Sequence, residues 1–225
     1  MTDARAQILG AIRNGLRHAV LPGATGDAVA PHAGALDAQR LWPPFEQALT
    51  ALTGHVHHAA SAVEAATIVA AIAAEHGART FLGWDGDQLG CDGLLDALAS
   101  RGLARLPYDL AFDAAGRATD VPALGDIVLG LTGSDAAIAD AGAIVLVSGP
   151  GRGRLASLLP PVHVAIAAAS RIWPSLPALL EDEPGLVGRG ANTVVIAGPS
   201  RTADIEMTLT HGVHGPKHLH VIVMP

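Results

Sequence analysis

The fold is decided by residues 126–168, DIVLGLTGSDAAIADAGAIVLVSGPGRGRLASLLPPVHVAIAA. This stretch holds three nearly unbroken apolar runs, at 126–131, 143–148 and 162–168, separated by segments rich in glycine, proline and polar residues. Short continuous apolar runs are typical of strands that are buried on both faces of a sheet. Because helical patterns alternate with such runs, the stretch predicts an α/β fold whose sheet carries helices on both faces.

The rest of the chain continues this pattern in both directions. Further strands are predicted at 55–59, 80–83, 103–106, 192–197 and 219–223. Helices are predicted at 44–52, 62–76, 93–101, 155–159, 176–180 and 203–211, with one more short helix at 136–140. Ser61 and Glu64 have the spacing of a capping box, and Pro43 and Pro44 are expected to open the helix at 44–52.

The first 40 residues differ from the remainder. Ile8, Leu9, Ile12 and Leu16 form an apolar stripe at helical spacing, whereas residues 19–40 lack periodicity and are rich in glycine, alanine and proline. We therefore expect an N-terminal helical arm with an irregular connector over 1–40, followed by an α/β domain over 41–225. Arginines interrupt every apolar run of the arm, so a signal peptide is not predicted, and no apolar run is long enough to span a membrane.

Composition excludes several classes of function. The net charge is −7 and the single lysine is Lys217. Proteins that bind nucleic acids or anionic membrane surfaces cluster positive charge, and this sequence has no such cluster. Aromatic residues make up only 3% of the chain, which leaves few platforms for stacking bases. The single cysteine, Cys91, excludes an internal disulfide and a four-cysteine iron–sulfur cluster within this chain, and it fits a reducing cytoplasm.

The segment GPSRTADIE at 198–206 follows a predicted buried strand. Ligands of open α/β sheets bind at the carboxyl ends of strands, and helix N-termini attract anions. If a helix begins near Thr202, Arg201 is placed to clamp a carboxylate or a phosphate. The alternative is simple capping by Ser200 or Thr202, with Arg201 paired to Asp204 or Glu206.

Two other turns follow apolar strands in the same way. SGPGRGR at 148–154 combines alternating glycines with two arginines, but it matches neither the dinucleotide fingerprint nor the P-loop, so a tight turn with solvated arginines is the alternative. In TGSD at 132–135, Asp135 either caps the next helix or lines a ligand cleft together with the other two turns. If the three strands are parallel neighbours, Arg154, Arg201 and His163 converge on one cleft that suits a small carboxylate or phosphate.

The predicted ligand-binding residues come from these turns, from one strand and from the C-terminal segment. They are Gly133, Asp135, Gly151, Arg154, His163, Ser200, Arg201, Thr202, Asp204, Glu206 and His214. Histidines are crowded near the C-terminus, where 211 with 214 and 218 with 220 have spacings open to metal ligation. We nevertheless predict no metal site, because the intervening glycines fix no geometry.

The C-terminal half resembles the lactate-utilization protein C family, which carries the LUD domain. The resemblance rests on GSDAAIADAGAIVLVSGPGRGRLASLLPPVHVAI at 133–166 and on VVIAGPSRTADIEMTLTHGVHGPKHLHVIV at 194–223. It implies a fold like that of the NagB, ribose-5-phosphate isomerase and CoA-transferase group. It also implies a role in bacterial oxidation of L-lactate to pyruvate, beside iron–sulfur partner proteins that carry the clusters, with no cofactor on this chain.

One segment departs from the family pattern. The family usually shows I-A-E-T-G-T, whereas this chain has IADAGA at 138–143, so the glutamate is shortened to Asp140 and both threonines are alanines. We therefore expect an accessory subunit that binds a small anion, and the alternatives are a free-standing CoA-transferase-like or sugar-phosphate-isomerase-like enzyme and a metabolite-sensing module. A covalent CoA-transferase needs a carboxylate nucleophile. Asp135, Asp140 and Asp204 all have capping explanations.

Overall fold

The computed structural model describes residues 4–17, 38–106, 124–203, 209–211 and 214–225, with the backbone alone for 6, 16–17, 201–203 and 209–211. The chain divides into two compact units, Met1–Pro31 and His32–Pro225. In the first unit, α1 (Ala4–Arg17) confirms the predicted helix, and its Ile8, Leu9 and Ile12 are exposed. Among the described residues, every helix is too short or too polar to span a bilayer.

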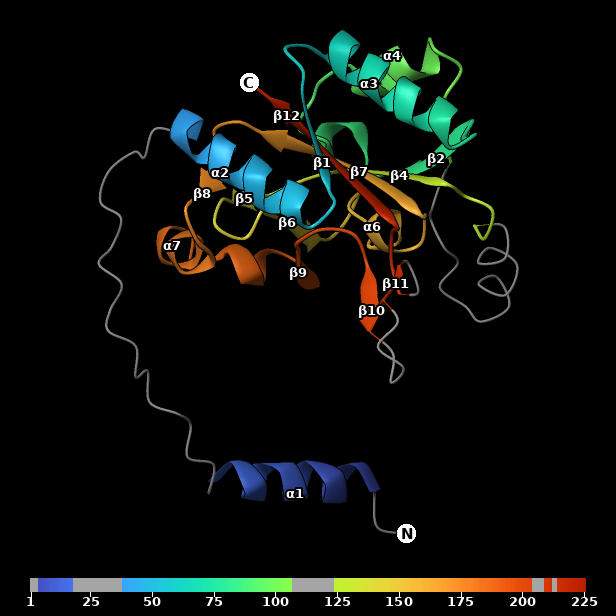
Figure 1. Cartoon of the computed structure of the whole chain (residues 1–225). Coiled ribbons are helices and arrows are strands. Elements are labelled where there is room, and N and C mark those ends of the chain that lie inside the picture. Colours follow the sequence, from blue (N-terminus) through green and yellow to red (C-terminus); the bar gives the residue numbers. More distant parts are fainter. Residues whose placement is uncertain (1–3, 18–37, 107–123, 204–208, 212–213) are drawn as a thin grey trace. The chain divides into compact units, whose positions relative to one another are not determined.

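The second unit is built around a six-stranded sheet with the order β1-β12-β7-β4-β2-β3. Each pairing in this sheet is parallel, so the predicted α/β class is confirmed (Figure 1). The strands are β1 (His55–His58), β2 (Thr80–Gly83), β3 (Ala104–Leu106), β4 (Leu129–Gly133), β7 (Val162–Ala168) and β12 (His218–Met224).

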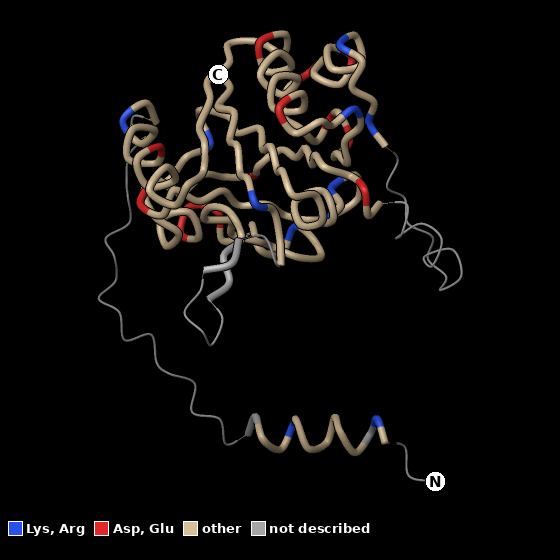
Figure 2. The backbone as a smooth tube through the Cα atoms, turned by 45° about the vertical axis from the view of Figure 1, so that its right-hand side comes forward, with Lys and Arg blue, Asp and Glu red and all other residues tan. Residues whose placement is uncertain are grey.

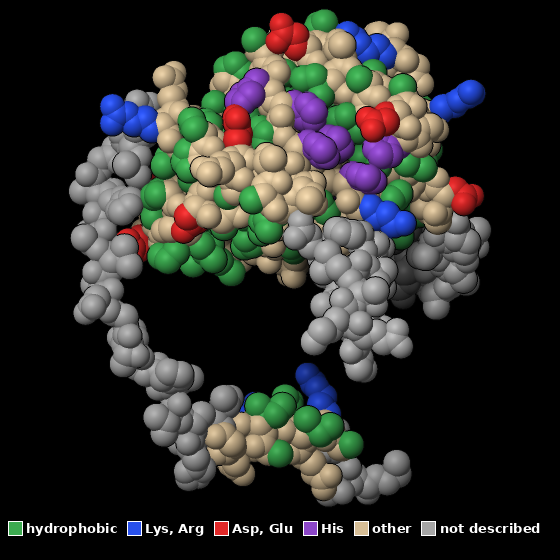
Figure 3. Space-filling model, viewed as in Figure 1, with side chains coloured by type: hydrophobic (Ala, Val, Ile, Leu, Met, Phe, Trp, Pro, Cys, Tyr) green, Lys and Arg blue, Asp and Glu red, His purple; other side chains and the backbone are tan. Residues whose placement is uncertain are grey.

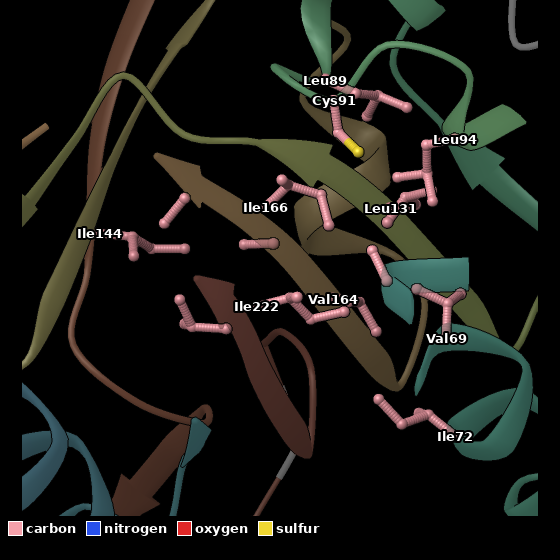
Figure 4. Packing of buried hydrophobic residues seen from close by; sticks show 14 of the residues in the cluster. Val69, Ile72, Leu89, Cys91, Leu94, Leu131, Ile144, Val164, Ile166 and Ile222 are labelled. Atoms are coloured by element: carbon pink, nitrogen blue, oxygen red, sulfur yellow. The ribbon is translucent and has the colours of Figure 1, made fainter. Parts of the chain in front are cut away.

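Helices cover both faces of this sheet. On one face, α3 (Ala62–Glu75) and α4 (Leu94–Ala99) pack on the alternate side chains of β4, β7 and β12, as Figure 4 shows for the apolar core. On the other face, α6 (Leu155–Leu158) crosses β4 so closely that a Cβ at Gly130 would lie 1.9 Å from the carbonyl oxygen of Ala156. The N-terminus of α3 confirms the predicted cap, since Ser61 Oγ accepts the backbone N–H of Glu64.

A smaller four-stranded sheet lies beside the first, in the order β8-β5-β6-β9. Its strands are β5 (Ala136–Ile138), β6 (Ala143–Ser148), β8 (Ile172–Trp173) and β9 (Asn192–Ile196). One face of β6 joins the main core, while the other face packs on α7 (Leu176–Asp182) and η2 (Leu186–Arg189). The short helix predicted at 136–140 is wrong, because residues 136–138 form strand β5. Side chains alternate along a strand, so Ala137 packs in the main core while Ala136 and Ile138 pack in the core under α7.

Two further predictions need correction. The helix predicted at 203–211 is wrong, since β10 (Arg201–Ala203) pairs antiparallel with β11 (Leu209–His211) and sets Thr202 opposite Thr210. β-branched residues such as threonine favour strands over helices.

The helix expected at 44–52 is α2 (Ala38–Ala51), so both prolines lie inside it rather than before it. Its inner face buries Trp42, Phe45 and Leu49. Because Trp42 lies before the two prolines and the other two residues lie after them, burial of this face stabilises the helix on both sides of the prolines.

Charges are dispersed over the described chain. In Figure 2 the Lys and Arg positions lie scattered among the Asp and Glu positions. Positive charge is therefore not gathered on one part of the described backbone.

Candidate functional site

A cleft of about 300 Å³ opens where β6 ends, and it is named the arginine cleft here. Four segments of the chain meet there: η1 (Gly86–Gln88), the turn between β4 and β5, the end of β6 with the turn after it, and η2. The side chains that the following paragraphs use are those of Gln88, Asp135, Arg152 and Arg189, all of which line this cleft.

Asp135 and Gln88 fix the guanidinium group of Arg152. Asp135 Oδ1 accepts from Arg152 Nη1 at 2.7 Å, and Asp135 Oδ2 accepts the backbone N–H of Val147 at 2.8 Å. Arg152 Nε donates to Gln88 Oε1 at 2.7 Å, and the guanidinium carbon lies 5.4 Å from the ring centroid of Trp84. Among the described residues Arg152 Nη2 has no hydrogen-bond partner, so this nitrogen is the one available to a ligand.

The turn that presents Arg152 depends on glycine. Backbone hydrogen bonds join Gly149 and Arg152 in both directions, and Gly151 between them has a φ of +71°. Proline at the second position and a positive φ at the third are the features of a type II turn. The carbonyl oxygen of Gly151 also accepts the N–H of Asp85, whose carboxylate pairs with Arg105. The turn is therefore anchored to the end of β2.

We expect Gly151→Ala to destabilise the protein by about 1–3 kcal/mol, because a side chain at positive φ is strained. The added Cβ would also lie 2.7 Å from Asp85 Oδ2. The matched control is Gly149→Ala, where a Cβ would meet no heavy atom within 4 Å. Thermal unfolding of the two variants checks the prediction, and equal melting temperatures would contradict it.

A second guanidinium group, that of Arg189, lines the cleft from η2. Glu183 forms ion pairs with both Arg171 and Arg189, and Arg171 Nε donates to the carbonyl oxygen of Asp135 at 3.0 Å. The hydrogen bond from Arg171 is the largest cause of the lowered pKa of Glu183. The ion pairs at the cleft thus join three guanidinium groups with two carboxylates, and the surplus of one positive charge suits a small anion.

The structure brings together Gly133, Asp135 and Gly151 among the predicted site residues. Gly133 lies so close to η1 that a Cβ there would stand 2.5 Å from the carbonyl oxygen of Gln88. This close approach lets Gln88 reach Arg152. Ligand binding by these residues stays a prediction, but their juxtaposition is a feature of the fold.

His163 lies in the core on the α6 side of the sheet. It is 0% exposed, and its Nε2 is 2.8 Å from Thr132 Oγ1. Its Nδ1 has no hydrogen-bond partner within the described part of the chain. Burial lowers the pKa of His163 to about 3, so the ring is neutral at physiological pH. Arg154 is exposed at the N-cap of α6 and does not line the arginine cleft.

Ser200, Arg201, Thr202 and His214 do not line the arginine cleft. Ser200 N–H donates to the carbonyl oxygen of Pro216 at 2.8 Å, and His214 is exposed. Arg201 and Thr202 contribute backbone to β10, while positions 204 and 206 lie outside the described residues. The expectation that three turns share one edge of a parallel sheet is wrong, because β6 and β9 pair antiparallel in the smaller sheet.

Sequence reasoning missed Gln88 and Arg189 as lining residues. Arg152 stood in the GPGRGR segment, where it was noted as one of two arginines, and Arg154 was preferred to it. Gln88 had no signal of its own, since its role arises only from the packing of η1 on Gly133. Arg189 likewise reaches the cleft only because η2 packs on β6.

The parallel sheet, the smaller sheet beside it and the arginine cleft define an α/β protein with a cleft that two arginines line. The LUD domain family matches residues 43–224, and the chain belongs to that family. A solved relative, a DUF162 family protein from Deinococcus radiodurans, has a TM-score of 0.58 and 21% identity, covering 84% of this chain and 99% of its own. This likeness shows the fold.

Curated relatives match by sequence. Lactate utilization protein C of Geobacillus sp. (strain WCH70) is 32% identical over 168 residues, which are 73% of this chain and 70% of the relative. Uncharacterized protein NMB1437 of Neisseria meningitidis is 38% identical over 101 residues, 44% of this chain and 43% of the relative. Lactate utilization protein C of Macrococcus caseolyticus is 39% identical over 106 residues. The chain spans less than half the length of the last two relatives, 43% of each.

Proposed function

We propose that this protein acts in lactate utilization. Its role is that of an accessory subunit in bacterial oxidation of L-lactate to pyruvate, which binds a small carboxylate and works beside iron–sulfur partner proteins. Membership of the LUD domain family and the likeness to lactate utilization protein C support this proposal. The clusters are assigned to the partners because Cys91, the single cysteine of the chain, is buried.

The observation that carries the proposal is the fixed guanidinium group of Arg152 in the arginine cleft. Lactate and pyruvate each carry one carboxylate, and arginine binds carboxylates with directional, charge-assisted hydrogen bonds. Asp135 and Gln88 hold two of the three guanidinium nitrogens, so the third is oriented before the ligand arrives. Such preorganisation reduces the entropy lost on binding. Arg189 adds a second positive charge on the same cleft.

The geometry argues less well for a free-standing CoA-transferase-like enzyme. Asp135 is the carboxylate in the cleft, and both of its oxygens already accept hydrogen bonds, from Val147 N–H and from Arg152. Hydrogen bonds and an ion pair stabilise the charge on this carboxylate, which makes it a weaker nucleophile toward an acyl group. A binding role therefore fits the site better than covalent catalysis.

Growth on L-lactate as the sole carbon source tests the proposal. A strain that carries Arg152→Gln at the native locus is expected to lose growth on L-lactate and to keep growth on pyruvate. Arg154→Gln is the matched control, because Arg154 is exposed and does not line the cleft. Immunoblots confirm that both variants accumulate. Normal growth of a deletion strain that keeps intact partner genes would overturn the proposed function.

A further inference from the structure

A second cleft has a volume of about 380 Å³ and is named the histidine cleft here. It shares no lining residue with the arginine cleft. Figure 3 shows histidine side chains gathered on the face formed by β1, β12 and the end of α3. Five of them line this cleft: His55, His57, His76, His218 and His220. The LUD domain assignment and the proposed function account for none of these five rings.

Strand register explains why the histidines gather. In the parallel pairing of β1 with β12, His55 lies opposite His220, and alternate residues of a strand point to the same face. The rings of His55 and His220 stack with centroids 4.7 Å apart and an interplanar angle of 17°. His76, at the C-cap of α3, meets His218 with centroids 4.7 Å apart. The cluster is thus fixed by the sheet and by one helix end.

His220 is the buried centre of the cluster. It is 6% exposed, and its Nδ1 shares a hydrogen bond of 3.1 Å with His57 Nε2. Its Nε2 is buried and has no hydrogen-bond partner among the described residues. A protonated His220 carries a proton on both nitrogens, so Nδ1–H then donates to His57 while Nε2–H requires an acceptor.

The charged groups around the cluster decide which anion fits. Burial is the largest cause of the lowered pKa values of His57, His218 and His220, and the pKa of His220 falls to about 3. The neighbouring histidines lower the pKa of His220 further through charge repulsion. Lys217 lowers the pKa of His218, whereas Glu75, which also lines the cleft, raises it. An anion beside the rings would reverse the effect of burial, while the carboxylate of Glu75 disfavours a dianion.

The wall opposite the histidines is apolar. It is formed on α3 by Ile68, Ala71 and Ile72. Among the described residues no group of three or more histidine, cysteine or acidic side chains has the geometry to hold a metal ion. A ligand for this cleft therefore combines one anionic group with an apolar part.

We propose that the histidine cleft binds a small monocarboxylate with a short aliphatic chain, and that the His57–His220 pair takes up one proton as it binds. The carboxylate accepts a hydrogen bond from His220 Nε2–H, and the aliphatic chain packs on Ile68 and Ile72. The proton comes from solvent, and no covalent bond changes. Because the bound state holds more protons than the free state, affinity rises as the pH falls.

Butyrate is the probe for this proposal, and the full-length Arg152→Gln protein is the background, so that the arginine cleft does not contribute. Calorimetry in two buffers of different ionisation enthalpy is expected to show proton uptake, with affinity rising by up to about a hundredfold between pH 7.5 and pH 5.5, the limit for one proton. Ring signals of His220 in NMR spectra are expected to titrate at higher pH with butyrate present. Inorganic phosphate is expected to bind more weakly, because it has no aliphatic chain to pack on Ile68 and Ile72.

Variants of two histidines separate the site from the surrounding fold. His220→Asn is expected to abolish proton-linked binding, and His55→Gln, at an exposed ring that stacks on His220, is expected to weaken it without a change in folding. His58→Asn is the matched control, because His58 belongs to β1 and pairs with Glu46 outside the cleft. Butyrate binding without proton uptake, equal binding by the His55 and His58 variants, or tight binding of Zn²⁺ alone would overturn the proposal.

Discussion

Asp135→Ala is expected to lower the free energy of unfolding by about 3 kcal/mol, because it leaves a half-buried guanidinium and a backbone N–H without their acceptor. The Asp135 side chain is only 9% exposed and that of Arg152 is 30% exposed, so solvent replaces the lost bonds poorly. Urea unfolding followed by circular dichroism measures the change. The cleft should lose its shape together with its stability, since Arg152 is then held by Gln88 alone.

Two further substitutions sharpen this experiment. Asp135→Asn keeps an acceptor for Val147 N–H and is expected to destabilise less than alanine. Asp140→Ala is the matched control, because Asp140 is exposed on the next turn, and exposed substitutions rarely exceed about 0.5 kcal/mol. If Asp135→Ala and Asp140→Ala unfold at the same urea concentration, the ion pair does not organise the cleft.

Mild acid is expected to destabilise the protein through its buried histidines. The pKa values of His163 and His220 fall to about 3 in the folded chain. An unfolded histidine has a pKa of about 6.5, so the unfolded state binds more protons between these values. Stability is therefore complete above pH 6.5 and falls as the pH is lowered. One such group contributes a loss on the order of 2 kcal/mol at pH 5.

Urea midpoints at pH 7.5 and pH 5 measure this loss. The range stops at pH 5 because Glu183, whose pKa is lowered, adds its own loss of stability only in stronger acid. His163→Leu removes one titrating group, so its stability is expected to depend less steeply on pH than that of the parent protein. An unchanged slope in His163→Leu would show that His163 does not resist protonation in the folded state.

Strands were the part of the fold that the sequence predicted best. The runs at 143–148 and 162–168 match β6 and β7 residue for residue, because a strand buried on both faces needs continuous apolar sequence. Residues 136–140 and 203–211 were wrongly predicted as helices, since short alanine-rich or threonine-bearing segments take their conformation from their neighbours in space. Pairing with β6 in the smaller sheet makes residues 136–138 a strand. Pairing of β10 with β11 makes strands of residues 201–203 and 209–211.

The two clefts show the same limit for sites. The turns that hold Gly133, Asp135 and Gly151 were visible as glycine-bearing segments after apolar strands. Gln88 was not, because only the tertiary packing of η1 brings it to Arg152. In the histidine cleft, the spacing of 218 and 220 was noticed, but the register that sets His55 opposite His220 requires the sheet order. The local sequence pattern therefore predicts the turn or the strand that carries a site residue. The other residues of the site follow only from the order and packing of the elements in space.

The proposed function requires that Arg152 in the arginine cleft binds the carboxylate of a small acid. Calorimetric titration of L-lactate into the full-length protein, into Arg152→Gln and into Arg154→Gln measures this binding. The expected result is saturable binding at one site, an affinity about ten- to a hundredfold lower for Arg152→Gln, and parental affinity for Arg154→Gln, because a hydrogen bond to a charged group contributes about 1.5–3 kcal/mol. Equal affinities in the parent protein and in Arg152→Gln, or no binding of L-lactate by the parent protein, would contradict the claim.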